Sequence, residues 1–411
     1  MSANLSTKMP KRSLEPARRV GGKRHKTAKT LTKRPGKVFA RHLREKLSPV
    51  GMHLGIRMIR ANRIRFGNRG DNDPRLPQDH QNATLKALED CLAQGRSELD
   101  VYYYRHRLGD GTQYGRESTR GLASQTMPRL LRAIVVGESH FDIDMVNAHF
   151  AILADWACTN LPETDFPCLF EYVCKRKDKL KEIIDAHSSA LYNVTRDDAK
   201  DLFITVLYRK LTEDFYNSWL SRKVNKHTRK LERPALKCNE TFRKWSVNFA
   251  REIDFLRNEM LSRHPKFCER YEATDHKGTF FNRLITDLEH THIVAVKQLL
   301  EQHGWTVDAI IHDGCHGVKQ GSKQVDTNTI NQQLKLRWPS GFIKVKAKDF
   351  DEPDIPVEWR ADAEAKAKSF KAVTPALLIV NEDEVRAAVA KARKVDSVDP
   401  PQIKNADFSL V

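Results

Sequence analysis

The sequence predicts an α+β fold in which a few strands from distant parts of the chain surround a largely helical insertion. Two observations predict it. Apolar runs that end in aspartate are typical of strands, and two such runs occupy residues 141–145 and 309–314. Between them, from Asn147 to about Leu300, the apolar spacing is mostly helical, with prolines as interruptions.

The remaining elements follow from local composition. A helix is expected over 83–93, and a β-branched and aromatic run predicts a strand at 101–104, followed by a glycine turn at 109–111. The apolar triplets 134–136 and 141–143 bracket Gly137-Glu138-Ser139 and predict a hairpin. Later elements are a helix over 283–302, strands at 307–311 and 342–347, and a helical piece within a peripheral segment, 361–411.

The net charge of +18 is concentrated at the N-terminus. Residues 1–48 contain 15 Lys or Arg against Glu15 and Glu45, which leaves the other residues only mildly basic. Such a segment with few apolar residues predicts a disordered basic tail that binds polyanions. A nuclear or organelle address and a solubilising extension are alternative interpretations.

The sequence argues against membrane and secreted classes. No stretch approaches the roughly 20 apolar residues of a membrane span, and no signal peptide is visible. The seven cysteines form no C-x-x-C pair, so neither a zinc site nor a disulfide framework is expected. The expected location is intracellular.

A helix near residue 200 carries a ridge of functional side chains. Thr195 is the expected N-cap, with Asp198 as its capping-box partner. The ridge residues recur every four positions: Arg196, Lys200, Ile204 and Tyr208. Two cations, an aliphatic and an aromatic residue would suit the phosphates and base of a nucleoside triphosphate. The alternative is an ordinary solvated charged face, since aspartates intersperse the ridge.

The aspartates of the two apolar runs are candidate metal ligands. Apolar neighbours flank Asp142, Asp144 and Asp313, and a carboxylate beside buried positions needs a partner or a metal. Because alternate residues of a strand share a face, either or both of Asp142 and Asp144 could bind. Taken separately, each run is equally compatible with a turn or cap aspartate. Taken together, they suit a site for two Mg²⁺ ions, with Mn²⁺ as an alternative.

The order of these segments resembles motifs A, B and C of family A DNA polymerases and of the related single-subunit phage-type RNA polymerases. The ridge matches their R-x3-K-x7-Y pattern through Arg196, Lys200 and Tyr208, and His312-Asp313 resembles the His-Asp of motif C. Asp142 would take the place of the motif A aspartate, with Asp144 competing for it. Upstream, Tyr114-Gly115-Arg116 is similar to the segment that precedes motif A in these enzymes. The resemblance covers roughly residues 110–350.

The chain departs from the pattern at several positions. The DNA enzymes usually carry a glutamate five residues after the motif A aspartate, where Asn147 stands if Asp142 is that residue. Family members often have an aromatic residue in place of Ile204 and a glycine in place of Arg209, and Gly314 follows the motif C aspartate where an acid is usual.

The resemblance implies a right-hand architecture with a small antiparallel palm sheet and helical fingers. The predicted segments are a basic tail (1–48), an N-terminal or thumb-like region (49–135), palm with motif A (136–160), fingers (161–269), palm with motif C (270–355) and a C-terminal tail (356–411). The short segment before motif A leaves no room for a proofreading nuclease, so none is expected.

The resemblance also implies roles for the site residues. Asp142 and Asp313 would ligate two Mg²⁺ ions, with Asp144 as an accessory or alternative ligand. Arg196 and Lys200 would hold the triphosphate and Tyr208 would stack near the base or sugar. Arg116 would lie along the primer–template minor groove, His312 would steady the primer end, and Asn147 would crowd a ribose 2′-hydroxyl.

The sequence therefore favours a template-directed nucleotidyltransferase, with DNA polymerase preferred. Its partners would be a primer–template, nucleoside triphosphates and other replication proteins. A single-subunit RNA polymerase or a primase-like enzyme remains open at this point. A metal-dependent nuclease and a non-catalytic basic nucleic-acid-binding protein are alternatives from other classes.

Overall fold

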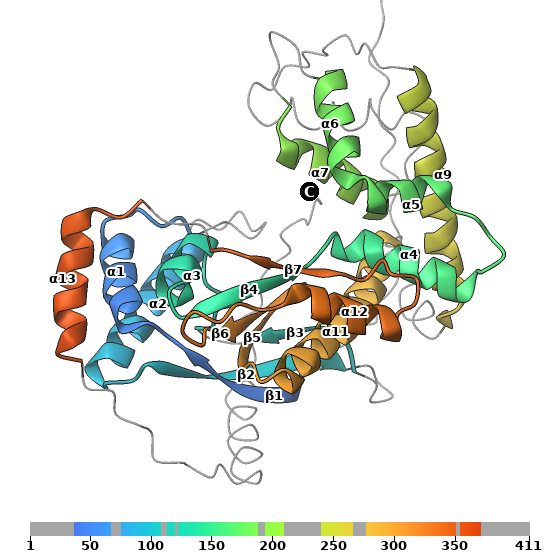
Figure 1. Cartoon of the computed structure of the whole chain (residues 1–411). Coiled ribbons are helices and arrows are strands. Elements are labelled where there is room, and N and C mark those ends of the chain that lie inside the picture. Colours follow the sequence, from blue (N-terminus) through green and yellow to red (C-terminus); the bar gives the residue numbers. More distant parts are fainter. Residues whose placement is uncertain are drawn as a thin grey trace, which may run out of the picture. The chain divides into compact units, whose positions relative to one another are not determined.

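The structure of the chain is a computed structural model that describes residues 37–66, 75–107, 113–119, 122–187, 194–208, 240–265, 277–350 and 354–370. Contacts divide the chain into two units, 1–35 and 36–411, and every described residue belongs to the second. There, helices combine with small antiparallel sheets (Figure 1), which confirms the predicted α+β class.

One sheet has the strand order β1-β2-β3. Its strands are β1 (Lys37–Lys46), β2 (Glu98–Arg107) and β3 (Gln113–Thr119), each antiparallel to its neighbour. The strand predicted at 101–104 is confirmed within β2. The glycine turn at 109–111 lies outside the described residues.

The prediction of a disordered tail over 1–48 is wrong for its last part, because Lys37–Lys46 is strand β1. Long-range pairing with the tyrosine-rich β2 decides this, and composition alone does not show it. Glu45, only 1 % exposed, accepts hydrogen bonds from the Tyr103 hydroxyl (2.8 Å) and the Ser124 amide (2.6 Å). Residues 1–36 lie outside the described part of the chain.

The other sheet has the order β5-β6-β4-β7 and carries both aspartate runs. Its strands are β4 (His140–Met145), β5 (Val307–Ile311), β6 (Gly314–Val318) and β7 (Val345–Lys348). The strand predicted at 307–311 is confirmed. The strand predicted at 342–347 is displaced, since β7 begins only at Val345. Because β4 lies between β6 and β7, residue 144 is opposite Gly314 on one side and Lys346 on the other.

The predicted hairpin at 134–136 and 141–143 is wrong, because the first triplet belongs to helix α3 (Arg129–Val136). Packing against α1 (Pro49–Arg60) overrides the β propensity of its apolar residues. The helices approach so closely at Gly51 that an added Cβ would lie 2.4 Å from the Ile134 carbonyl oxygen. Helix α2 (Arg75–Ala93) contains the predicted helix 83–93.

Helix α13 (Val357–Lys368) packs along α1 (Figure 1), so this part of the predicted peripheral segment is attached to the body. The Arg57 guanidinium lies 4.4 Å from the ring centre of Trp359, and Ala363 is buried. Residues 371–411 lie outside the described part of the chain.

The helical region between the aspartate runs is confirmed in its described parts, and these have an aromatic core. Its helices are α4 (Ala148–Asn160), α5 (Pro167–Cys174), α6 (Arg176–His187), α7 (Arg196–Tyr208), α9 (Glu240–Ser262) and α11 (Lys277–Gln302). Helix α12 (Thr327–Arg337) follows β6. Phe150, Tyr172, Phe203 and Phe249 are nearly fully buried against one another, joining α4, α5, α7 and α9. This packing positions the start of α7 relative to α4.

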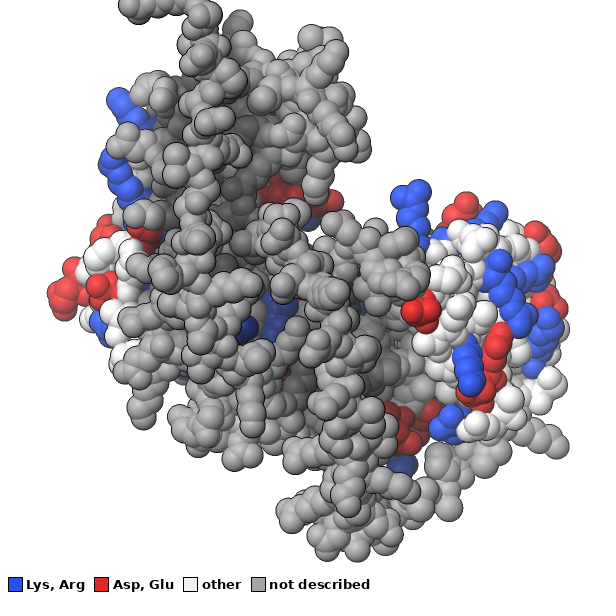
Figure 2. Space-filling view, turned by 180° about the vertical axis from the view of Figure 1, so that it is seen from behind, with Lys and Arg blue, Asp and Glu red and all other residues white. Residues whose placement is uncertain are grey.

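The surface seen in Figure 2 carries Lys and Arg interspersed with Asp and Glu over its described part. Ion pairs of this mixed kind include Arg57–Asp362 at 3.2 Å and Arg60–Glu89 at 2.6 Å. Within the described segments, no helix combines the length and apolar character needed to cross a bilayer.

Candidate functional site

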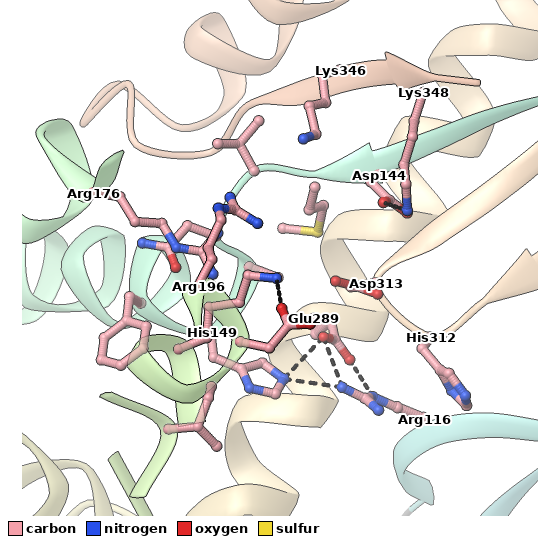
Figure 3. A pocket seen from close by; sticks show the side chains of 18 of the residues that line it. Arg116, Asp144, His149, Arg176, Arg196, Glu289, His312, Asp313, Lys346 and Lys348 are labelled. Atoms are coloured by element: carbon pink, nitrogen blue, oxygen red, sulfur yellow. Dashed lines mark hydrogen bonds and ion pairs between the residues drawn. The ribbon is translucent and has the colours of Figure 1, made fainter. Parts of the chain in front are cut away.

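A cleft of about 650 Å³ brings together the ends of β4 and β5 and the starts of α4, α6 and α7. Figure 3 shows side chains from all these elements pointing into it. The lining is predominantly charged: Arg116, Arg129, Arg176, Arg196, Lys200, Lys346 and Lys348 against Asp144, Asp197, Glu289 and Asp313. The other lining residues are Met145, Val146, Asn147, Ala148, His149, Phe150, Ile204 and His312.

One side of the cleft is formed by Asp144 and Asp313, which we call the carboxylate wall. Asp144 stands near the end of β4, and Asp313 lies in the two-residue turn between β5 and β6. The Met145 amide donates a hydrogen bond to the Asp313 carbonyl oxygen (2.9 Å), which ties the two segments together. A Cβ on Gly314 would lie 2.8 Å from the Asp144 carboxylate, so only glycine at position 314 leaves room for that carboxylate.

Two non-glycine residues beside the wall have left-handed backbone conformations. Asn147 has a φ of 56° and His312 a φ of 45°. Such values are uncommon outside glycine and often mark sites where geometry serves function. Asn147 precedes α4 as its N-cap without a side-chain capping bond, and within the described segments its buried Nδ2 has no hydrogen-bond partner.

Asp142 does not line the cleft, although it was the preferred motif A aspartate. It is 8 % exposed and lies opposite His316 and Lys348 in the sheet, with its Oδ1 3.8 Å from His316 Nε2. Asp142 and Asp144 lie two residues apart on one strand, but only Asp144 reaches the cleft. There its Oδ2 accepts a hydrogen bond from Lys348 Nζ at 3.1 Å.

The carboxylates repel one another. Burial, with the neighbouring charge of Asp144, raises the pKa of Asp142 to about 6. Burial also raises the pKa of Asp313, and the charges of Glu289 and Asp144 add to that effect. Such a concentration of acid groups is unfavourable unless a cation neutralises it.

The floor of the cleft is a hydrogen-bonded chain that runs from Tyr208 to Arg116. The Tyr208 hydroxyl lies 2.6 Å from His149 Nδ1, and His149 Nε2 lies 3.0 Å from Glu289 Oε1. His149 Nε2 also lies 3.0 Å from Arg116 Nη2, so this ring nitrogen contacts both members of the ion pair. Arg116 pairs with both oxygens of Glu289 through Nε and Nη2, the latter at 2.9 Å.

Glu289, in the middle of this hydrogen-bonded series, is fully buried. Its burial acts to raise the pKa, but the His149 hydrogen bond and the charges of His149 and Arg116 outweigh it, so the pKa is lowered. Burial raises the pKa of Tyr208. The hydrogen-bonded chain from Tyr208 to Arg116 is therefore a set of fixed donors and acceptors beneath the cleft.

Arg176 and Arg196 lie on the side of the cleft away from these acids (Figure 3). Together with Lys200, which lines the cleft from the same helix as Arg196, we call them the cationic wall. Helix α7 has the predicted capping box: the Thr195 amide donates to Asp198 Oδ2 (3.0 Å), and the Asp198 amide to Thr195 Oγ1 (3.2 Å). Lys200 Nζ lies 2.6 Å from the exposed Asp197. Within the described segments, neither Arg176 nor Arg196 forms a salt bridge with a carboxylate.

Most of the site residues expected from the sequence therefore meet at one place. The cleft is lined by Asp144, Asp313, His312, Asn147, Arg116, Arg196, Lys200 and Ile204. Tyr208 is not part of the lining, but supports it through His149. Asp142 lies behind the lining.

Sequence reasoning missed Arg129, Arg176, Lys346 and Lys348 as lining residues, and it assigned no role in the site to His149. A signal was available for the two lysines, because residues 344–348 alternate lysine with apolar residues as an exposed strand face does. His149 is the fifth residue after Asp144, a position that becomes informative once Asp144 is taken as the motif A aspartate. We see no sequence signal for Arg176.

Among the described residues, no group of three or more His, Cys, Asp or Glu side chains is arranged to hold a metal ion. The two acids of the carboxylate wall are nevertheless compatible with Mg²⁺. This ion keeps several waters and is commonly held by one or two carboxylates together with substrate phosphates.

Comparisons with known proteins give distant similarities. The chain matches no protein-family model. It is 22 % identical over 216 residues to a protein named putative helicase V13 from Sputnik virophage, which covers 52 % of this chain and 25 % of that protein. The chain thus spans about a quarter of the length of this curated relative.

Among solved structures, the chain is similar to the POL domain of Pol1 from M. smegmatis, determined in complex with DNA primer-template and dNTP. The TM-score is 0.41 at 11 % identity, and the match covers 70 % of this chain and 53 % of that chain. At these values neither relative establishes a family.

Proposed function

We propose that this protein is a template-directed nucleotidyltransferase, with DNA polymerase activity as the preferred form. The observation that carries the proposal is the cleft, in which a carboxylate wall and a cationic wall face one another. Transfer of a nucleotidyl group needs both: acids to hold metal ions near the reacting oxygen, and cations to hold the phosphates.

Asp144 and Asp313 would hold Mg²⁺. We propose Asp144 in place of Asp142 as the principal motif A ligand, because Asp144 lines the cleft. When bound, the ions would acidify the primer 3′-hydroxyl and neutralise charge on the phosphates. The buried Asp142 would support the wall from behind, through its charge and its place beside His316 and Lys348.

Arg196 and Lys200 would bind the triphosphate. Arg196 has no carboxylate partner in the described part of the chain, and Lys200 pairs only with the exposed Asp197, so both are available to an anion. A guanidinium can form two parallel hydrogen bonds with a phosphate, whereas an ammonium acts as a point charge. Ile204, 40 % exposed, would contact the base.

The sugar would lie against His149. His149 follows Asp144 by five residues, which is the spacing between Asp142 and Asn147. Its ring is held by hydrogen bonds to Tyr208 on one nitrogen and Glu289 on the other. A fixed ring at this place would crowd a ribose 2′-hydroxyl and so favour deoxynucleotides. Arg116 and His312 would contact the primer strand at the edge of the cleft.

The test is extension of a labelled primer on a template by the full chain in Mg²⁺, with parallel reactions in Mn²⁺. The proposal expects products that lengthen by nucleotides complementary to the template. A metal-dependent nuclease would shorten the primer, and a binding protein would shift its mobility without changing its length. Either result, with no extension in either metal, would overturn the proposal.

The relative's printed name raises helicase activity as a second candidate. A helicase motor would need a phosphate-binding loop of the form G-x4-G-K-[ST], and the 411 residues contain no such sequence. The residues of this chain therefore support nucleotidyl transfer better than strand separation. Unwinding of a duplex with hydrolysis of ATP by the purified chain would reverse that preference.

A further inference from the structure

Arg176 is a cleft residue that the sequence did not single out. It is the first residue of α6 and lies outside the ridge of α7. In Figure 3 it points into the pocket beside Arg196, on the side away from Asp144 and Asp313. Its side chain contacts the hydroxyl of the buried Tyr172, but its Nε is buried without a hydrogen-bond partner among the described residues. A buried guanidinium N–H without an acceptor is unfavourable, unless a ligand supplies one.

The surroundings of Arg176 favour an anion. Residues at the N-termini of α4, α6 and α7 all line the cleft, and each terminus presents N–H groups and a partial positive charge. Independently, Asn147 is only 8 % exposed, lines the same cleft, and has an Nδ2 with no partner in the part of the chain that the structure describes. Two residues with unsatisfied donors, at the starts of different helices, thus line one cleft.

The anion must also tolerate the carboxylate wall. A single phosphate placed between the walls would be repelled by Asp144 and Asp313, unless metal ions intervened. A chain of phosphates can place its inner groups at the metal ions and its outer group away from the acids. Arg176 is on the side of the cleft where that outer group would be.

We propose that Arg176 binds the terminal phosphate of a nucleoside triphosphate and makes the cleft selective for triphosphates over diphosphates. This inference rests on the proposed function and adds a contact on a helix other than the one that carries the predicted ridge. Arg196 and Lys200 bind the phosphates nearer the metal ions, and Arg176 binds the phosphate farthest from them. A diphosphate leaves Arg176 without its ligand and binds more weakly.

The test compares dATP with dADP by titration calorimetry on the full chain in Mg²⁺, without nucleic acid. Arg176→Ala should weaken dATP binding by about tenfold, the usual effect of losing a charge-assisted hydrogen bond, and leave dADP binding within about twofold. The dATP-to-dADP affinity ratio should therefore collapse. Arg176→Lys should restore part of the ratio, because it keeps the charge but not the two-pronged geometry.

Lys181→Ala is the matched control. Lys181 is a cation on the same helix, but it is exposed, pairs with Asp185 at 2.7 Å and does not line the cleft. Its removal should leave the ratio at the wild-type value. An equal loss in Lys181→Ala and Arg176→Ala would show a general charge effect and overturn the inference. An unchanged ratio in Arg176→Ala would overturn it as well.

Tyr172→Phe separates ligand binding from local structure. It removes the hydroxyl that Arg176 contacts, while Arg176 itself remains. The inference expects the wild-type ratio in this variant; a collapse equal to that of Arg176→Ala would assign the effect to local structure instead. The readout is also independent of polymerisation. Primer extension with a normal ratio in Arg176→Ala refutes this inference alone, and a collapsed ratio without extension refutes the proposed function alone.

Discussion

The two walls of the cleft differ in how they are built. The carboxylate wall stands on paired strands: β4 is held between β6 and β7, and a backbone hydrogen bond joins Met145 to Asp313. The cationic wall stands on two helices, and its two arginines have no carboxylate partners among the described residues. Side chains on a paired sheet are rigidly placed, whereas long unpaired side chains on helices can adjust to a ligand. Under the proposed function, the two acids would be positioned before a substrate binds, and the phosphate contacts would form with it.

The largest expected effect lies on the carboxylate wall. Asp144→Asn or Asp313→Asn should lower the rate of primer extension by about 10³-fold or more, because a metal ion contributes several kcal/mol to the transition state. Single-turnover extension measures the loss. Asp185→Asn, an exposed aspartate on α6, is the control and should extend at the wild-type rate. Full activity in both wall variants would show that these acids do not hold the metal.

The rigidity of the carboxylate side can be tested through the floor beneath it. Glu289→Gln should lower the free energy of unfolding by about 3 kcal/mol, since it leaves Arg116 beside a neutral group in a buried place. Urea denaturation measures the change. Glu301→Gln on the same helix is the control, because its pair with Lys297 is at the surface and should change stability by less than about 1 kcal/mol. Equal small changes would contradict a rigid floor.

The burial of Asp142, together with repulsion by the neighbouring acids, predicts a pH dependence. The pKa of Asp142 is raised to about 6 in the folded state, against an ordinary value of 3.8. The folded protein therefore binds a proton more readily than the unfolded chain between these values, and stability increases as the pH falls from 7 towards 4.

The gain should be about 2 kcal/mol in metal-free buffer, and Asp142→Asn should remove most of this slope. Thermal or urea unfolding at several pH values measures it. Stability that falls over the same window in the wild type, with no change in the variant, would contradict the repulsion. Added Mg²⁺ should flatten the wild-type slope, because a bound cation favours the ionised acids.

The smallest effect concerns His149, which lies between the two walls. His149→Ala should reduce discrimination between deoxynucleotides and ribonucleotides by roughly tenfold, as expected when one steric contact in a pocket is lost. The ratio of kcat/KM values for dATP and ATP measures it. Asn147→Ala is the comparison variant, and a larger change there than in His149→Ala would return the sugar contact to Asn147.

Parts of the fold and site could be predicted from local sequence. The strand at 307–311, the strand within β2 and the capping box of α7 depend on periodicity and on residues a few positions apart, and all were confirmed. The predictions were wrong where strand pairing or helix packing between distant parts of the chain outweighed local sequence preference. Lys37–Lys46 became a strand by pairing with β2, and residues 134–136 became helical by packing on α1 at Gly51.

The amino-acid order alone established which residue types were available: two apolar runs ending in acids, and a helix with Arg196, Lys200 and Tyr208 on one ridge. It did not distinguish Asp142 from Asp144, because both lie on the same face of a strand. That choice depends on what covers each position, since the cleft opens at Asp144 while His316 and Lys348 neighbour Asp142. Arg176 likewise became a candidate only through folding, because the packing that brings α6 beside α7 is not written in the spacing of either helix.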